Sequence, residues 1–201
     1  MDPRIRDLLS ELERIGAAND AVESDRARKM LNLEPETAGL LAILARSSGA
    51  TRVLEIGTSN GYSTIWLAWA VAPSGGRVTS IDRDAKKHAA ARDNLTRAGF
   101  QDRVELCLGE ATPFAREVSG PFDLVFFDAD RISAPEQLHV LLPKLAPRVL
   151  LIADNALSHP QEIAGYLDVL SELPGFEHVV IPVGKGLSIA FRATPGLAQP
   201  S

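Results

Sequence analysis

One short segment constrains the fold more than any other part of the chain. The apolar run 53–56, which contains Glu55, leads directly into a turn with glycines at 57 and 61 and then into an apolar helical pattern. A strand, a tight turn and a helix in this order form the nucleoside sites of α/β proteins. Gly57 and Gly61 are four positions apart, so the G-x-G-x-x-G fingerprint of pyrophosphate binding is absent. The segment therefore predicts a nucleoside site without a pyrophosphate.

Apolar runs alternate with helical patterns from residue 52 onward. The runs predict strands at 53–56, 77–81, 104–108, 124–127 and 149–152. This alternation is typical of a parallel sheet covered by helices. After a predicted helix at 160–173, the runs 178–181 and 187–191 are separated by the short Gly-rich segment 182–186, which suits an antiparallel hairpin.

The length of 201 residues suffices for one domain with a full core, and we expect a single domain over 1–201. Its predicted parts are N-terminal helices over 1–50, a Rossmann-like α/β core over 51–193 and a frayed tail over 194–201. The core is predicted to hold seven mostly parallel strands, the last one antiparallel, with helices on both faces. The apolar stripes of the N-terminal helices suit either a cover over the site or a homodimer contact.

Composition disfavours several classes of partner. With 26 acidic and 21 basic residues the net charge is −5, so nothing favours broad attraction to nucleic acid or to an anionic membrane. The single Cys107 cannot form an internal disulfide, and no apolar stretch is long enough to span a membrane. We expect a cytoplasmic protein that binds small molecules.

Four chain segments should meet where the parallel strands end. They are 55–63, the acid Asp82, the turn 109–111 and the segment 127–131. Asp82 can accept hydrogen bonds from a ribose diol, and the amides that open the helix after Gly61 can bind a carboxylate. A lone G-x-x-x-G would favour a simple turn, with Asp82 a solvated acid. The agreement of all four segments favours a ligand site instead.

These motifs resemble those of class I S-adenosylmethionine-dependent methyltransferases, and more narrowly the catechol and caffeoyl-CoA O-methyltransferases. The resemblance covers roughly 33–192 of the sequence. It is carried by the segments 54–58, 61–63, 81–82, 108–111, 127–130 and 153–155.

The resemblance implies S-adenosylmethionine as cofactor. It further implies that Asp82 binds the ribose hydroxyls, that Glu55 helps to hold the ammonium group, and that Glu110 and Ala111 flank the adenine. The family usually has Asp at position 110, so Glu110 is a departure. The implied cofactor-binding residues are Glu55, Gly57, Thr58, Ser59, Gly61, Tyr62, Ser63, Asp82, Arg83, Gly109, Glu110, Ala111 and Asp128.

A second group of candidates, Asp128, Asp154 and Asn155, follows the fourth and fifth predicted strands. Two carboxylates and an amide oxygen suit Mg²⁺, or alternatively Mn²⁺ or Ca²⁺. Their positions resemble the family's three metal ligands. Such an ion would lower the pKa of an acceptor hydroxyl and orient its oxygen toward the methyl group. The alternative is that Asp128 caps the next segment and that 154–155 form a turn.

Arg131 is a clear departure, because the family has a general-base Lys at this position. Arg stays protonated and accepts a proton poorly. It can instead orient an anionic acceptor or stabilise an oxyanion, with water or Asp130 taking the proton. We therefore take Arg131 and Asp128 as the candidate catalytic residues, against the alternative that Arg131 is exposed in a solvated loop.

The sequence thus predicts methyl transfer to a hydroxyl of a small, catechol-like or phenolic acceptor with the help of a divalent metal. Larger members of the family that the chain resembles have a longer insertion than the segment 156–160 after Asn155, so the resemblance implies an acceptor site that is more open or that takes a wall from a partner subunit. Asp128-Ala129-Asp130-Arg131 stands where base-methylating relatives have a Pro-Pro motif, which disfavours a nucleic-acid base. A metal-independent methyltransferase and a non-catalytic cofactor-binding module remain as alternatives. The missing third glycine disfavours a nicotinamide oxidoreductase.

Overall fold

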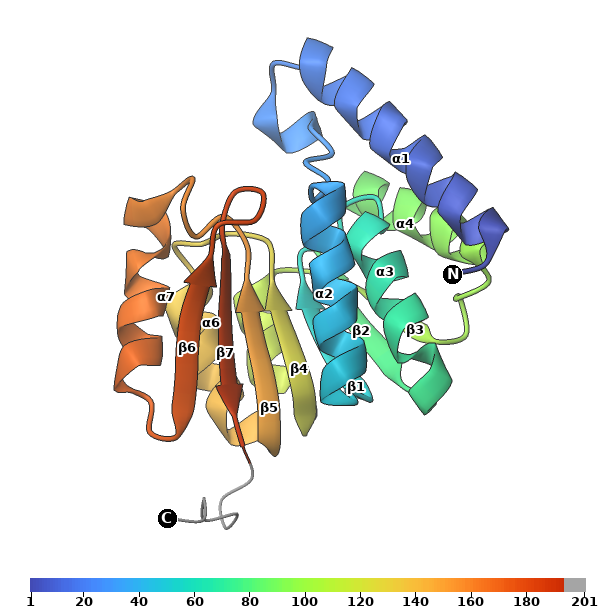
Figure 1. The fold of residues 1–201 in the computed structure, drawn as a ribbon. Helices are drawn as coiled ribbons and strands as arrows, with labels where there is room; N and C mark the ends of the chain where they lie inside the picture. The colour runs from blue at the N-terminus through green and yellow to red at the C-terminus, as the bar shows by residue number, and fades with distance from the viewer. Residues whose placement is uncertain (194–201) are drawn as a thin grey trace.

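The computed structural model describes residues 1–193, and the predicted frayed tail 194–201 lies outside the described residues. Its centre is a seven-stranded sheet in the order β3-β2-β1-β4-β5-β7-β6 (Figure 1). The strands from β1 to β5 pair in parallel, whereas β7 runs antiparallel to both β5 and β6. The strands are β1 Arg52–Ile56, β2 Arg77–Asp82, β3 Val104–Leu108, β4 Phe122–Phe127, β5 Leu145–Ala153, β6 Phe176–Ile181 and β7 Leu187–Arg192. The predicted sheet, including its antiparallel last strand and the terminal hairpin, is confirmed.

Seven α-helices connect or precede these strands in residues 1–193. They are α1 Pro3–Val22, α2 Pro35–Ser48, α3 Tyr62–Val71, α4 Ala85–Ala98, α5 Ala111–Glu117, α6 Ala134–Leu141 and α7 Pro160–Glu172. Helices α1, α2 and α7 begin with proline, which needs no amide partner in the first turn. Over the described part of the chain, no helix combines the length and the apolar character needed to cross a membrane.

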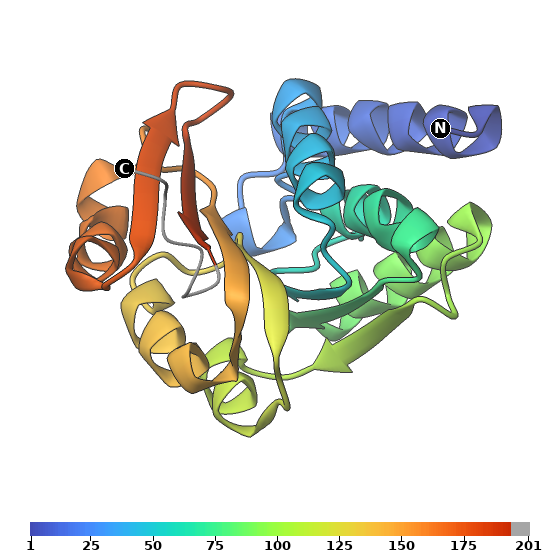
Figure 2. The ribbon, with the colours of Figure 1, turned by 60° about the horizontal axis from the view of Figure 1, so that its bottom comes forward.

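Both faces of the sheet are buried at its central strands β1 and β4, which explains why these strands read as continuous apolar runs, whereas the edge strands β3 and β6 are partly exposed. On one face, Val53 and its neighbours pack with α2 and α3. On the other face, Leu54 and its neighbours pack with α6 and α7. Figure 2 shows the sheet between these two helical layers. The sheet thus divides the hydrophobic core into two parts. The edge at which the parallel strands end is available for a ligand site.

The strand order reverses between β1 and β4, the two strands whose ends support the glycine turn. The Gly57 amide donates to the Ile81 carbonyl at 3.0 Å, and the Asp128 amide donates to the Ile56 carbonyl at 2.8 Å. Gly57 has φ +109°, and a Cβ there would press into the Asp128 carbonyl group, 2.8 Å from its carbon. Only glycine therefore allows this turn to lie against the end of β4.

Gly57→Ala should destabilise the protein, because it combines a strained φ with a clash against backbone. We expect the free energy of unfolding to fall by about 2–4 kcal/mol. Gly39→Ala in α2 is the matched control, since a Cβ at Gly39 would meet nothing within 4 Å. The control should gain about 0.5–1 kcal/mol from its helical position. Urea denaturation measures both variants, and equal stabilities for Gly57→Ala and the parent protein would contradict the requirement for glycine.

Candidate active site

A cavity of about 810 Å³ opens where the parallel strands end, and the predicted segments meet in its wall. Figure 1 shows the α1–α2 linker and the β6–β7 turn at this same end of the molecule. The predicted site residues in the wall are Gly57, Thr58, Ser59, Tyr62, Ser63, Asp82, Arg83, Gly109, Glu110, Ala111, Asp128, Arg131, Asp154 and Asn155. The prediction that four chain segments converge at the strand ends is confirmed.

Asp82 ties the end of β2 to the glycine turn. Its Oδ2 accepts from the Ser59 amide at 2.7 Å, and its Oδ1 accepts from the Asp84 amide at 2.9 Å. Ser59 has φ +48°, a backbone conformation that L residues rarely adopt. The Asp82 carboxylate therefore stabilises a strained turn and still lies in the cavity wall, where further lone pairs can meet a ligand.

Two predicted residues, Glu55 and Gly61, lie outside the cavity wall. Glu55 is fully buried, and its carboxylate accepts hydrogen bonds from the hydroxyls of Ser63, Thr64 and Ser80. Burial raises the pKa of Glu55 to about 7. Gly61 precedes α3 with φ +85° and so shapes the start of that helix. Glu55 thus holds β1, β2 and α3 together from beneath the cavity.

Asp128 and Asp154 form the acidic end of the cavity, together with Asn155. Burial raises the pKa of Asp154 to about 6, and burial together with the Asp154 charge raises the pKa of Asp128 well above its usual range. Asp154 Oδ2 accepts from Asn155 Nδ2 at 2.6 Å. Asp154 Oδ1 is buried and has no hydrogen-bond partner among residues 1–193.

This acidic end fits a hard divalent cation. Across residues 1–193 no three His, Cys, Asp or Glu side chains are grouped as a metal site, so the set is two carboxylates and an amide. The unpartnered Asp154 oxygen and the raised pKa values both show that a positive charge placed here would be stabilised. Oxygen donors of this kind are those that Mg²⁺ prefers.

Arg131 is held in place, contrary to the alternative of an exposed arginine in a solvated loop. Its Nε and Nη2 donate to Glu162 Oε2 of α7 at 2.9 and 2.6 Å, and its side chain is only 11% exposed. Asp130 accepts from the Ile132 amide and from the Ser133 hydroxyl, so it caps the turn before α6. Arg131 therefore presents a fixed positive charge to the cavity.

The sequence did not reveal that the α1–α2 linker forms part of the wall. Asp20 of α1 accepts from the amides of Met30 and Leu31 at 2.7 and 2.8 Å, and Ser59 donates to the Met30 carbonyl at 2.7 Å. Met30 and Leu31 line the cavity. The N-terminal helices were predicted to cover the site or to form a homodimer contact. The linker between them lines the cavity, but no residue of α1 or α2 does, and the homodimer contact stays a prediction.

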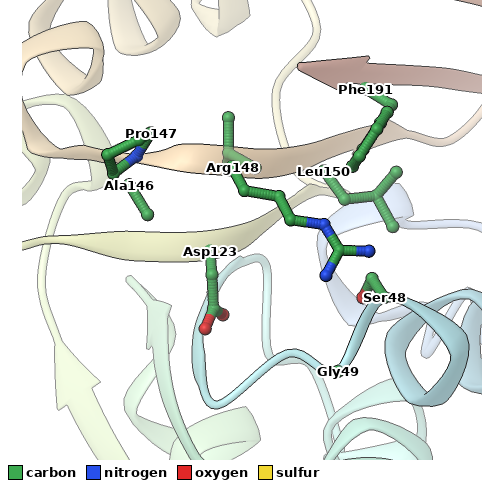
Figure 3. Close-up of a pocket in the computed structure, with 9 residues that line it drawn as sticks. Ser48, Gly49, Asp123, Ala146, Pro147, Arg148, Leu150 and Phe191 are labelled. Carbon is green, nitrogen blue, oxygen red and sulfur yellow. The ribbon is translucent and has the colours of Figure 1, made fainter. Parts of the chain in front are cut away.

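A second, smaller cavity of about 330 Å³ lies near the starts of β1 and β5 (Figure 3). Its Asp123 already accepts from the Thr51 amide, the Thr51 hydroxyl and the Arg52 amide at 2.8–2.9 Å. Arg148 lies over the Phe191 ring, 5.5 Å from its centroid. None of the predicted site residues lines this cavity. The larger cavity is therefore the candidate active site.

The sequence model of a protein family described as O-methyltransferase matches residues 6–193. The chain belongs to this family. The resemblance to class I S-adenosylmethionine-dependent O-methyltransferases is thereby confirmed.

Named relatives and solved structures of O-methyltransferases agree with this membership. A catechol O-methyltransferase of Niastella koreensis is 34% identical over 162 residues, which cover 78% of this chain and 72% of the relative. Another, from Mycobacterium tuberculosis, is 38% identical over 142 residues, covering 70% of this chain and 62% of the relative. The chain thus spans less than two thirds of the Mycobacterium enzyme.

Two solved structures of O-methyltransferases match the whole architecture. An O-methyltransferase from Bacillus cereus in complex with SAH superimposes with a TM-score of 0.79 at 29% identity, covering 93% of this chain and 91% of that chain. The O-methyltransferase TomG from Streptomyces achromogenes in complex with SAM has a TM-score of 0.76 at 27% identity, with 96% and 90% coverage. The Rossmann-like fold class predicted for this O-methyltransferase is therefore confirmed.

Glu55→Gln should make stability less dependent on pH. The folded-state pKa of Glu55, about 7, lies above its ordinary value of 4.5. The neutral form is therefore favoured by folding, so this contribution is complete below pH 4.5 and is lost as the pH rises through 7. Between pH 5 and pH 8, the parent protein should lose roughly 2–3 kcal/mol more stability than Glu55→Gln.

Urea denaturation at the two pH values measures this difference. Glu105→Gln, which alters an exposed glutamate of β3, is the control and should follow the parent protein. Parallel pH dependences for Glu55→Gln and the parent protein would show that the buried carboxyl group does not change its protonation on folding.

Proposed function

We propose that this chain transfers a methyl group from S-adenosylmethionine to a hydroxyl of a small phenolic or catechol-like acceptor, with a divalent cation at Asp128, Asp154 and Asn155. The observation that carries the proposal is that one continuous cavity joins Asp82 and the glycine turn to this acidic end. The names of the two catechol O-methyltransferase relatives support the acceptor class. The SAH and SAM complexes of the two matched structures support the cofactor.

At the cofactor end, the proposed contacts come from the turn between β1 and α3 and from the ends of β2 and β3. Asp82 accepts from the ribose hydroxyls, and the amides at the start of α3 bind the carboxylate. Glu110 and Ala111 border the adenine. S-adenosylmethionine supplies an electrophilic methyl group when it is bound. The chain's task at this end is to hold the cofactor so that this group faces the acidic end.

At the reaction end, Asp128, Asp154 and the Asn155 amide oxygen hold the cation in our proposal. A divalent cation in this position supplies the Lewis acidity that lowers the pKa of the acceptor hydroxyl. Arg131 stays protonated, so it orients the acceptor oxygen and stabilises its negative charge. The proton leaves to water or to the Asp130 carboxylate, which lies in the same cavity wall and keeps lone pairs beyond the two hydrogen bonds of its own turn.

Methyl transfer from labelled cofactor to a panel of hydroxylated aromatic molecules tests this proposal. We expect transfer with Mg²⁺, and its loss with a chelator. Asp154→Asn should lower the rate by about 100-fold or more, because it removes a charged ligand of the cation. Asp168→Asn on the outer face of α7 is the control and should keep the parent rate.

Other outcomes separate the alternatives. Transfer that survives both the chelator and Asp154→Asn would assign a metal-independent methyltransferase. Cofactor binding without transfer to any acceptor in the panel would favour a non-catalytic binding module.

A further inference from the structure

The turn between β6 and β7 brings a lysine to the acidic end of the cavity. Lys185 lines the cavity wall together with Asp128, Asp154 and Asn155. Its Nζ lies 2.9 Å from Glu34 Oε1, just before α2. From the sequence this turn is only a short Gly-rich connection, and the proposed function gives Lys185 no role.

The backbone of this turn is bonded to the loop that follows the proposed metal ligands. The Lys185 carbonyl accepts from the amides of Leu157 and Ser158, both at 3.0 Å. The Gly186 carbonyl accepts from the Ala156 amide at 2.9 Å. These three hydrogen bonds fix Lys185 beside the loop that begins at Asp154.

Glycines on both sides of Lys185 allow this close packing. Gly184 has φ +53°, and a Cβ there would enter the Glu34 carboxylate, 3.1 Å from its Cδ. Gly186 has φ +92°, and a Cβ there would lie 2.6 Å from the Leu157 amide nitrogen. The position of Lys185 is therefore set by a turn wedged between the start of α2 and the Leu157 loop.

Side chains of both charge signs surround Lys185 at the acidic end of the cavity. Its ammonium and the Arg131 guanidinium are two positive charges in the cavity wall that also holds Asp128 and Asp154. The Glu34 carboxylate pairs with the Lys185 ammonium and acts in the opposite sense. Arg131 is already bound to Glu162 by two hydrogen bonds, whereas Lys185 makes one ion pair among residues 1–193. Lys185 is thus a positive charge built into the wall beside two acids.

We propose that the Lys185 ammonium is a permanent positive charge in the cavity wall that lowers the affinity of the cavity for a divalent cation. When that cation is absent, the ammonium compensates the negative charges of Asp128 and Asp154. An ammonium near the two acids repels an incoming divalent ion, and solvent screens this repulsion only in part, because Asp154 is buried although the Lys185 side chain is 40% exposed. The Glu34 carboxylate limits this effect, since it pairs with the ammonium. The inference rests on the metal site of the proposed function.

Mn²⁺ binding, followed by electron paramagnetic resonance with neither cofactor nor acceptor present, tests the proposal apart from activity. Lys185→Gln should bind Mn²⁺ about tenfold more tightly than the parent protein. Glu34→Gln should bind it several-fold more weakly, because the variant loses a negative charge and releases the ammonium toward the acids. Lys87→Gln removes a cavity lysine next to Asp84 at the cofactor end and should leave the affinity unchanged.

The outcomes separate this inference from the metal site itself. Unchanged or weaker Mn²⁺ binding by Lys185→Gln, with binding intact in the parent protein, would overturn the role of Lys185 and leave the metal site standing. No binding by the parent protein or by any variant would overturn both. Lys185→Met removes the same charge while keeping an unbranched chain, and it replaces Lys185→Gln if that variant does not fold.

Discussion

The close contact between the Gly57 turn and the end of β4 determines where every other part of the site lies. At this point the sheet order reverses, so chain segments leave in opposite directions and open a cavity between them. The Asp128 amide bonds to the Ile56 carbonyl, and the position of Gly57 leaves no room for a Cβ. The glycine turn, which we propose holds the cofactor, and Asp128, the first proposed metal ligand, are thereby joined by backbone contacts that fix the two ends of the proposed site relative to each other.

Several acidic side chains around this contact are buried, and burial disfavours their ionised form. Glu55 is satisfied by three hydroxyl groups, so its burial serves the packing of β1, β2 and α3. Asp154 keeps an oxygen without a partner among the described residues. A buried polar atom of this kind costs free energy unless a ligand satisfies it. The contrast favours a structural role for Glu55 and supports the proposed metal-binding role of Asp154, although both have raised pKa values.

Local sequence was enough to predict the sheet, its antiparallel hairpin and the convergence of the strand ends. These features follow from the hydrophobic periodicity of the strands and helices and from the residue types in the turns, both of which are set by residues close together in the sequence. Asp82, Asp128 and Asp154 could be located for the same reason, since each lies at or just beyond a strand end. The burial of Glu55 beneath the cavity was not predictable from its motif. Its position depends on Ser80 of the neighbouring strand as much as on its own turn.

Contacts between distant parts of the chain account for the remaining differences. Asp20 binds the linker at Met30 and Leu31, and Glu34 pairs with Lys185 across about 150 residues of sequence. Neither the local hydrophobic periodicity nor a sequence motif indicates such pairs. The linker wall and the position of Lys185 therefore became visible only in the folded chain. The linker contacts the glycine turn through Ser59, and Lys185 lies in the cavity wall with the proposed metal ligands.

Calorimetric titration with S-adenosylhomocysteine determines whether the Gly57 turn and Asp82 together form the proposed cofactor site. Asp123→Asn is a matched control, because Asp123 also binds backbone amides beside β1 but lies in the smaller cavity. We expect binding by the parent protein and by Asp123→Asn, with affinity reduced about tenfold or more in Asp82→Asn. Equal affinities for Asp82→Asn and the parent protein, or no binding by the parent protein, would rule out this cofactor site.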